Sequence, residues 1–261
     1  MTALLVGLLG LVIGSFLNVV VWRVPRGESV IRPGSRCPAC GAPIRPYDNV
    51  PVLSWLMLRG RCRDCKTRVS PRYPLVELTT GVAFAAVGWH WQDDLTLLPA
   101  LLYLGGISIA LTLIDLDHQR LPDVIVLPSY AVVTILLVAA SFLGTVGNPL
   151  TVLGRALAGA VLMFLVYFLA AIAYPRGMGF GDVKLAGVLG LYLGWFGWGS
   201  LAVGFFAAFL LGGLFSVGLV ILGGAGRKTT VPFGPWMLLG AWVGLLAGDR
   251  IWDAYLGMVG F

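Results

Sequence analysis

Charged side chains are scarce in this chain: 11% of its 261 residues are Asp, Glu, Lys or Arg, against roughly 25% in an ordinary soluble domain. Hydrophobic residues make up 58% of the sequence, and its mean hydropathy is +0.90. A water-soluble globule of this length needs more polar residues to cover its surface. The shortage of charge excludes a soluble enzyme, a disordered chain and a nucleic-acid-binding domain. We therefore expect a protein that lies in a lipid bilayer and binds no nucleic acid.

The few charges are concentrated in one segment. Residues 23–77 contain 11 of the 18 basic residues and 4 of the 12 acidic residues, which gives this segment a net charge of +7. A basic loop next to a membrane usually faces the cytoplasm, because positive residues are retained on that side. We therefore expect loop 23–74 to be cytoplasmic.

Long apolar runs predict membrane-spanning helices, since about 20 apolar residues cross the hydrocarbon core as a helix. A transmembrane barrel would show alternating hydrophobicity instead. The fold class we predict is therefore an all-α polytopic membrane protein with about eight spans. The first apolar run has no positive charge before it and is not typical of a cleavable signal peptide. The predicted spans lie near Ala3–Trp22, Leu75–Trp91, Leu95–Leu113, Val124–Leu143, Val152–Ala173, Val183–Trp198, Ser200–Leu222 and Pro235–Leu246.

The remaining basic residues agree with eight spans and a cytoplasmic first loop. This topology places 16 of the 18 basic residues inside the cell and leaves only Arg155 and Arg250 outside. Both termini then face outward. The five basic residues that join the first loop on the cytoplasmic side are Arg120, Arg176, Lys184, Arg227 and Lys228.

All four cysteines of the chain fall in the predicted cytoplasmic loop, as two C-x2-C pairs. Each pair can present two thiolates to one tetrahedral Zn²⁺ ion, and neighbouring basic residues favour the thiolate form. The alternatives are two disulfides, which a reducing cytosol disfavours, or four thiols without a metal. We expect a structural zinc site made by Cys37, Cys40, Cys62 and Cys65.

Two acidic motifs follow predicted spans that end on the same side of the membrane. The first contains Asp115, and the second is Gly179-Phe-Gly181-Asp182-Val-Lys184. The two motifs can therefore meet despite the residues between them, and glycines allow the backbone to approach a site closely. Two neighbouring carboxyl groups share a proton, so that one activates water while the other polarises a peptide carbonyl. The chain has no competing Ser/His or H-E-x-x-H arrangement.

Acids at the ends of spans can also be helix caps or interfacial charges. Asp182 and Asp123 both lie where N-caps lie; we expect Asp182 to serve in both roles and Asp123 mainly as a cap. Between Asp115 and Asp117 we favour Asp115, because it is closer to the apolar span. His118 is better explained as an interfacial polar residue than as a general base.

The chain resembles the type IV prepilin peptidases over nearly its whole length. The likeness begins with Gly14-Ser-Phe-Leu-Asn18 and continues through the four-Cys loop, where Tyr47-Asp-Asn49-Val-Pro51 lies between the pairs. It includes Arg72-Tyr-Pro74-Leu-Val-Glu77, the Asp115 motif and the G-x-G-D motif. The three features together are far more specific than G-x-G-D alone.

The resemblance implies that Asp115 and Asp182 form the catalytic dyad, supported by Gly179, Gly181 and Lys184. It implies cleavage of prepilins or pseudopilins after the Gly that ends a basic leader, at the cytoplasmic face of the bacterial inner membrane. It also implies N-methylation of the new N-terminus with S-adenosylmethionine, for which no glycine-rich cofactor loop is visible. We expect an N-terminal region over 1–92 and a six-helix peptidase domain over 93–261.

Two other classes of function use the same acidic residues. A proton-coupled transporter would relay protons through them, but the acids gather at one face instead of the bilayer midplane, and internal repeats are not evident. A non-catalytic assembly protein would use the cysteine loop to bind a cytoplasmic partner. Glycines of the sixth and seventh spans, such as Gly190 and Gly204, fit either ordinary close helix packing or a moving gate.

Overall fold

The computed structural model of the chain describes residues 1–174, 178–223 and 231–260. Within these ranges the chain is helical and contains no β-strand, so the all-α prediction is confirmed. Three basic residues on which the predicted topology depends, Arg176, Arg227 and Lys228, lie outside the described residues.

Each predicted apolar run corresponds to one long helix. In the described part of the chain these are α1 (Thr2–Arg23), α3 (Arg72–His90), α4 (Leu98–His118), α5 (Asp123–Leu143), α6 (Pro149–Ala173), α7 (Phe180–Phe196), α8 (Trp198–Ile221) and α9 (Gly234–Val259). By length and composition, α1, α4, α5, α6 and α8 are able to cross a membrane. Helix α7 has only 17 residues, and α9 continues well past Leu246 into a more polar segment. The count of eight spans therefore stays a prediction.

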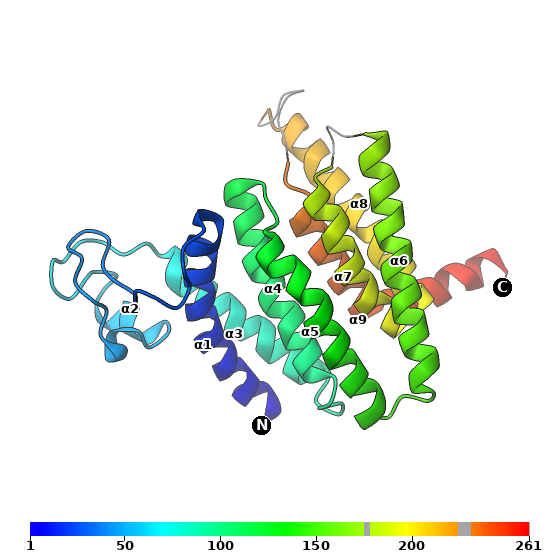
Figure 1. The fold of residues 1–261 in the computed structure, drawn as a ribbon, viewed down its shortest axis with the longest axis horizontal. Coiled ribbons are helices and arrows are strands. Elements are labelled where there is room, and N and C mark those ends of the chain that lie inside the picture. The colour runs from blue at the N-terminus through cyan, green and yellow to red at the C-terminus, as the bar shows by residue number, and fades with distance from the viewer. Residues whose placement is uncertain (175–177, 224–230, 261) are drawn as a thin grey trace. The chain divides into compact units, whose positions relative to one another are not determined.

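The chain divides into two compact units, Met1–Leu113 and Ile114–Phe261. In the first unit, α1 and α3 pack against each other at glycines. A Cβ added to Gly14 would lie 2.7 Å from the Cα of Glu77, and one added to Gly10 would lie 2.8 Å from the Cβ of Phe84. The mostly irregular segment between these helices projects from the pair and contains the short helix α2 (Leu53–Met57) (Figure 1).

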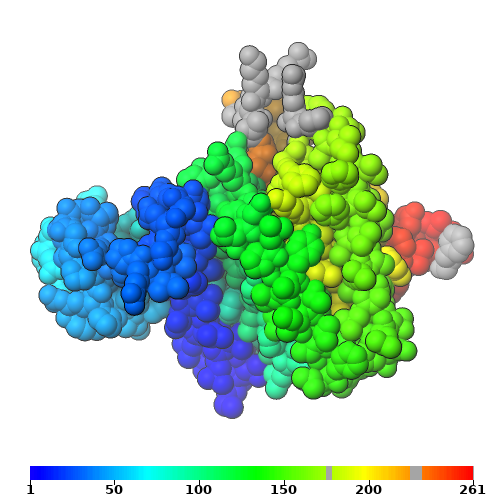
Figure 2. Space-filling model, viewed as in Figure 1, coloured from blue at the N-terminus to red at the C-terminus, as the bar shows by residue number. Residues whose placement is uncertain are grey.

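Helix α7 is the core of the second unit, and most of its residues are buried. It crosses α6 where Gly159 and Gly190 meet, because a Cβ on Gly190 would lie 2.5 Å from the Gly159 carbonyl oxygen. Helices α8 and α9 approach as closely: a Cβ on Gly240 would lie 2.7 Å from the Gly204 oxygen. Figure 2 shows the outer surfaces of α5 and α6, with only part of α7 visible between them. The glycines at both crossings, Gly159 with Gly190 and Gly204 with Gly240, therefore allow the helices to pack closely.

The up-and-down order of the helices in the second unit brings the first turns of three helices to the same end of the bundle. These helices are α5, α7 and α9, which begin at Asp123, Phe180 and Gly234. At the opposite end, the Arg155 guanidinium donates hydrogen bonds to the carbonyl oxygens of Gly194 at 2.7 Å and Trp195 at 2.6 Å. A cation at the C-terminus of α7 satisfies carbonyls that have no partner within the helix.

Candidate functional site

Asp115 lies near the end of α4 and is buried, with 5% of its surface exposed, whereas Asp117 is exposed. The Asp115 Oδ2 atom accepts a hydrogen bond from the backbone N–H of Gly234, the first residue of α9, at 3.0 Å. The approach is so close that a Cβ on Gly234 would lie 2.7 Å from the same oxygen. The start of α9 therefore fixes one oxygen of the Asp115 carboxyl.

Asp182 is also buried, at 9% exposure, in the first turn of α7. The helix begins at Phe180, earlier than the predicted Val183, so Gly179 is the N-cap residue. The Asp182 Oδ2 atom accepts a hydrogen bond from the Gly179 N–H at 3.0 Å. Asp182 therefore closes the start of the helix from inside the first turn, as a carboxylate at position N3 does.

Contacts of Leu121 bring the two acidic motifs to the same place in the second unit. Leu121 packs between these motifs: a Cβ on Gly181 would lie 3.0 Å from the Leu121 Cβ, and one on Gly234 would lie 3.2 Å from its Cδ2. The second unit thus gathers two buried acids that lie 67 residues apart in the sequence. The sequence patterns did not predict the roles of Gly234 and Leu121; the Gly-Pro step at the start of the last apolar run is the feature that marks Gly234.

Lys184 pairs with Asp123 across α5 and α7, with 2.7 Å between its Nζ and the Asp123 Oδ2. The expectation that Asp123 is mainly a helix cap was wrong: it is the first residue of α5, Pro122 is the N-cap, and no side-chain cap bond forms. The carboxylate turns to the lysine because a full positive charge is a better partner than a backbone amide. Nearby, the Tyr130 hydroxyl donates to the Lys184 carbonyl at 2.7 Å. These contacts fix the helix that carries Asp182.

The four cysteines gather in the loop of the first unit. All four thiol sulfurs lie within 4.8 Å of one another, and Cys37 Sγ is 3.8 Å from Cys65 Sγ. Four sulfurs about 2.3 Å from a tetrahedral ion are themselves separated by about 3.8 Å. The donor set therefore fits one tetrahedral metal ion, and it argues against two separate disulfides because all four thiols are free.

The two cysteine turns have the same backbone geometry. The N–H of Gly41 donates to the Cys37 carbonyl at 2.9 Å, and the N–H of Lys66 donates to the Cys62 carbonyl at 3.1 Å. Both donors have a left-handed backbone, with φ of +72° at Gly41 and +60° at Lys66. Each turn thus directs its two thiols to the same side, so that two copies of one local structure build the cluster.

The polypeptide around the cluster already favours thiolate at one position. The hydroxyl and backbone N–H of Thr67 lower the pKa of Cys65 to about 6. The Ala42 amide acts to lower the pKa of Cys40, but the neighbouring thiols, Cys65 foremost, raise it to about 11. A bound cation removes this conflict, since metal ligation stabilises every thiolate in the set.

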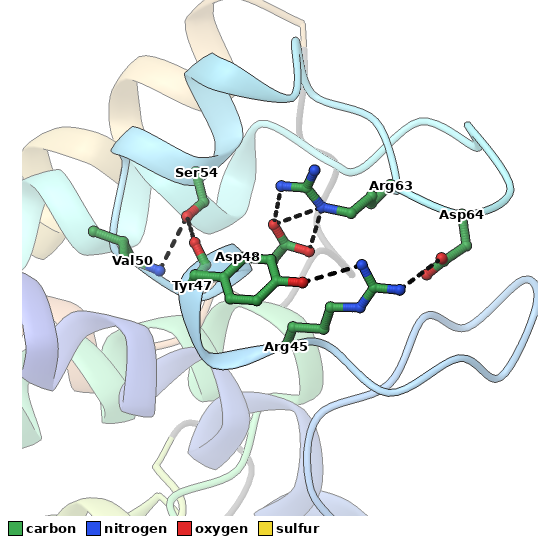
Figure 3. Close-up of polar contacts among 7 residues, drawn as sticks. All are labelled: Arg45, Tyr47, Asp48, Val50, Ser54, Arg63 and Asp64. Atoms are coloured by element: carbon green, nitrogen blue, oxygen red, sulfur yellow. Dashed lines mark hydrogen bonds and ion pairs between the residues drawn. The ribbon is translucent and has the colours of Figure 1, made fainter.

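A second polar network links the loop segment between the two cysteine pairs to the residues of the second pair (Figure 3). Arg63 donates to both oxygens of Asp48, at 3.0 and 2.8 Å, and lowers the pKa of that carboxyl. Arg45 donates to the Tyr47 hydroxyl at 3.1 Å and lies 3.6 Å from Asp64. These contacts stabilise a loop that has few aliphatic residues of its own.

The loop contacts the helices of the first unit at Glu77, a buried acidic residue near the start of α3. Its Oε2 atom accepts a hydrogen bond from the N–H of Val52 at 2.7 Å. Val52 has φ +61°, and the N–H of Leu53 donates to the Pro51 carbonyl at 2.6 Å, so the segment forms a strained γ-turn. Glu77 therefore anchors the loop to the α1–α3 pair.

A cavity of about 400 Å³ lies beside the second cysteine pair and is lined by Leu58, Arg59, Arg61, Cys62 and Lys66. Its charged lining is entirely basic. Such a lining suits the carboxylate of S-adenosylmethionine but offers no acidic partner to its sulfonium, so the cavity is not assigned to that cofactor.

Comparison with known proteins identifies the family. Residues 8–91 match the bacterial peptidase A24 N-terminal domain, and residues 102–217 match the type IV leader peptidase family. Three curated relatives carry the name prepilin leader peptidase/N-methyltransferase. The protein of Pseudomonas aeruginosa is 37% identical, with 97% of this chain and 93% of the relative covered. Those of Stutzerimonas stutzeri and Neisseria gonorrhoeae are each 36% identical and cover 95% and 96% of this chain, and 91% and 92% of their own lengths.

No solved structure matches the chain. The family matches extend over both units, and the relatives align along nearly the full length at more than a third identity. A buried pair of acids at one end of a helical bundle and a four-thiol cluster accompany those matches. The chain therefore belongs to the type IV leader peptidase family.

Proposed function

We propose that the chain is a membrane aspartyl endopeptidase that removes the leader of type IV prepilins or pseudopilins, with Asp115 and Asp182 as its catalytic dyad. The observation that carries this proposal is the pair of buried acids at one end of the second unit. Each accepts a backbone N–H on its Oδ2 atom, from Gly234 and from Gly179. The curated relatives that the chain resembles are named for the same reaction.

The geometry supports different roles for the two oxygens of each carboxyl group. With Oδ2 of Asp115 and of Asp182 bound to backbone amides, the Oδ1 atoms are left for the shared proton and the water. One carboxylate takes a proton from water as its oxygen attacks the scissile carbonyl carbon, and the other acid protonates the carbonyl oxygen. The tetrahedral species then collapses as the C–N bond breaks and the leaving amine takes a proton. Because the dyad is buried, bulk water does not screen these charges.

The substrate we propose is a helix whose basic leader remains in the cytoplasm. A peptide bond in a helix resists cleavage, and the Gly at the cleavage position lowers helix stability by about 1 kcal/mol relative to Ala. We further propose that the cysteine loop and the dyad face the cytoplasm of the bacterial inner membrane, because the basic residues concentrate in that loop. We also propose that a domain boundary near residue 92 separates the N-terminal region, which contains the cysteine loop, from the peptidase domain.

For the cysteine loop we propose a structural Zn²⁺ ion held by Cys37, Cys40, Cys62 and Cys65. A closed set of four thiolates is typical of structural zinc and leaves no position for substrate. The loop has a small core, so metal binding contributes to its folding. For the second reaction, N-methylation of the new terminus with S-adenosylmethionine, we propose the activity on the strength of the relatives' names and assign it no residues.

The decisive experiment is cleavage of a purified prepilin by the wild type, Asp115→Asn and Asp182→Asn in lipid nanodiscs. Each substitution keeps the size of the side chain but removes a titratable group, so kcat falls by roughly 100- to 10 000-fold. The matched control is Asp117→Asn, which neutralises an exposed acid two residues from Asp115 and leaves the rate unchanged. Cleavage by either dyad variant at the wild-type rate would contradict the proposal. Inactivation by Asp117→Asn with Asp115→Asn active would transfer the role to Asp117.

A further inference from the structure

Tyr167, on α6, is one of the most deeply buried side chains of the second unit, with 1% of its surface exposed. Its hydroxyl has no hydrogen-bond partner among the described residues. Buried hydroxyls are nearly always paired, because leaving one unpaired forfeits the hydrogen bonds it makes with water. A buried, unpaired donor therefore indicates a partner that comes from outside the fold.

The packing of α6 against α7 places Tyr167 level with Asp182. The two helices run antiparallel and touch at Gly159 and Gly190. Tyr167 lies eight residues from Gly159 and Asp182 lies eight residues from Gly190, both toward the same end of the bundle, at about 12 Å along each helix. The ring of Phe168, next to Tyr167, lies 6.3 Å from the ring of Phe180, two residues before Asp182, so these turns of α6 and α7 face each other.

Three aromatic rings fix the position of the Tyr167 ring. The centroid of Phe205 is 5.8 Å away at an interplanar angle of 88°, that of Phe209 is 5.6 Å away, and that of Phe233 is 6.3 Å away. Phe233 directly precedes Gly234, whose amide binds Asp115. The ring is thus clamped between α8 and the segment that holds the first acid, so the hydroxyl is presented in a fixed direction.

We propose that the Tyr167 hydroxyl binds the carbonyl oxygen of the scissile peptide bond and stabilises the tetrahedral species; this proposal rests on the peptidase function above. As the water oxygen bonds to the carbonyl carbon, the C=O π pair moves onto the oxygen, which takes the proton of the acidic carboxyl. Tyr167 donates its O–H to the other lone pair of that oxygen and keeps its own proton throughout. A phenol suits this role because it stays protonated at neutral pH.

Tyr167→Phe tests the proposal because it removes only the hydroxyl and keeps the clamped ring. We expect kcat for prepilin cleavage to fall roughly 100-fold, with KM changed by less than about threefold, as for the loss of one preorganised donor. A substrate peptide with a hydroxyl-bearing tetrahedral carbon at the cleaved position should bind the variant more weakly by a similar factor. Thermal stability should be unchanged or higher, since the hydroxyl has no partner in the fold. Tyr255→Phe, which removes an exposed hydroxyl near the C-terminus, is the control and should match the wild type.

Several results would overturn the proposal. A wild-type kcat for Tyr167→Phe would show that the hydroxyl does not contact the reacting carbonyl. Equal binding of the tetrahedral analogue by both proteins would exclude a role in the transition state. A shifted pH profile with an unchanged maximal rate would mean that Tyr167 acts only on Asp182, and a less stable variant would reveal a structural partner. Asp182→Asn, assayed in parallel, separates the two proposals: if it is inactive while Tyr167→Phe is active, only the tyrosine assignment fails.

Discussion

Replacing Gly234 by Ala tests how tightly the start of α9 holds Asp115. The new Cβ would lie 2.7 Å from the Asp115 Oδ2, whereas ordinary contacts begin near 3.4 Å, so the carboxyl must retreat by about 0.7 Å. Leu121 blocks part of the space, because its Cδ2 lies 3.2 Å from the same Cβ. A misplacement of about 1 Å at a reacting group costs on the order of 100-fold in rate, so we expect kcat to fall roughly 10- to 100-fold. The assay is initial-rate cleavage of a prepilin in nanodiscs.

Gly257→Ala is the matched control, because it lies on the same helix and a Cβ there meets nothing within 4 Å. It should leave the cleavage rate unchanged and stabilise α9 by up to about 1 kcal/mol. Thermal unfolding of both variants separates a local effect on Asp115 from a general loss of fold. If Gly234→Ala cleaves at the wild-type rate, the Gly234 amide does not position a catalytic carboxyl and the reasoning fails.

Three further predictions concern packing, the metal and pH. Gly190→Ala places a Cβ 2.5 Å from the Gly159 carbonyl oxygen and should destabilise the protein by about 1–3 kcal/mol. Gly213→Ala is the control, because a Cβ there meets nothing within 4 Å and should not destabilise the protein. Thermal unfolding of the two variants measures the difference. Cys37→Ser with Cys62→Ser should abolish bound zinc in elemental analysis and make the loop sensitive to protease; unchanged metal content would rule out the cluster. Arg63 lowers the pKa of Asp48, so this pair stabilises the loop at neutral pH and the effect disappears as pH falls through that lowered pKa. Asp48→Asn should therefore be more protease-sensitive than the wild type near neutral pH but not in acid, and a difference that persists in acid would contradict the assignment.

The hydrophobic runs predicted the position of every long helix in the described part of the chain, because an apolar run in a bilayer must satisfy its backbone within the helix itself. The helix boundaries differ by a few residues from the predicted ones, since the first residue of a helix depends on local capping. Helix α7 begins at Phe180 because Asp182 accepts the Gly179 N–H from inside the first turn. Asp123 was misread for a related reason: its partner, Lys184, lies on another helix and is invisible to local sequence patterns.

The order of residues alone establishes which chemical groups are available: two acidic motifs at the ends of apolar runs, and four cysteines in two identical spacings. These are properties of residue type and order, and scarcity of charge made them visible. The groups that surround these motifs are set by the packing of the helices. The Gly234 amide on Asp115, and the unpaired hydroxyl of Tyr167 level with Asp182, arise from close helix contacts at glycines. Such contacts depend on how surfaces of separate helices fit together, and no single apolar run contains that information.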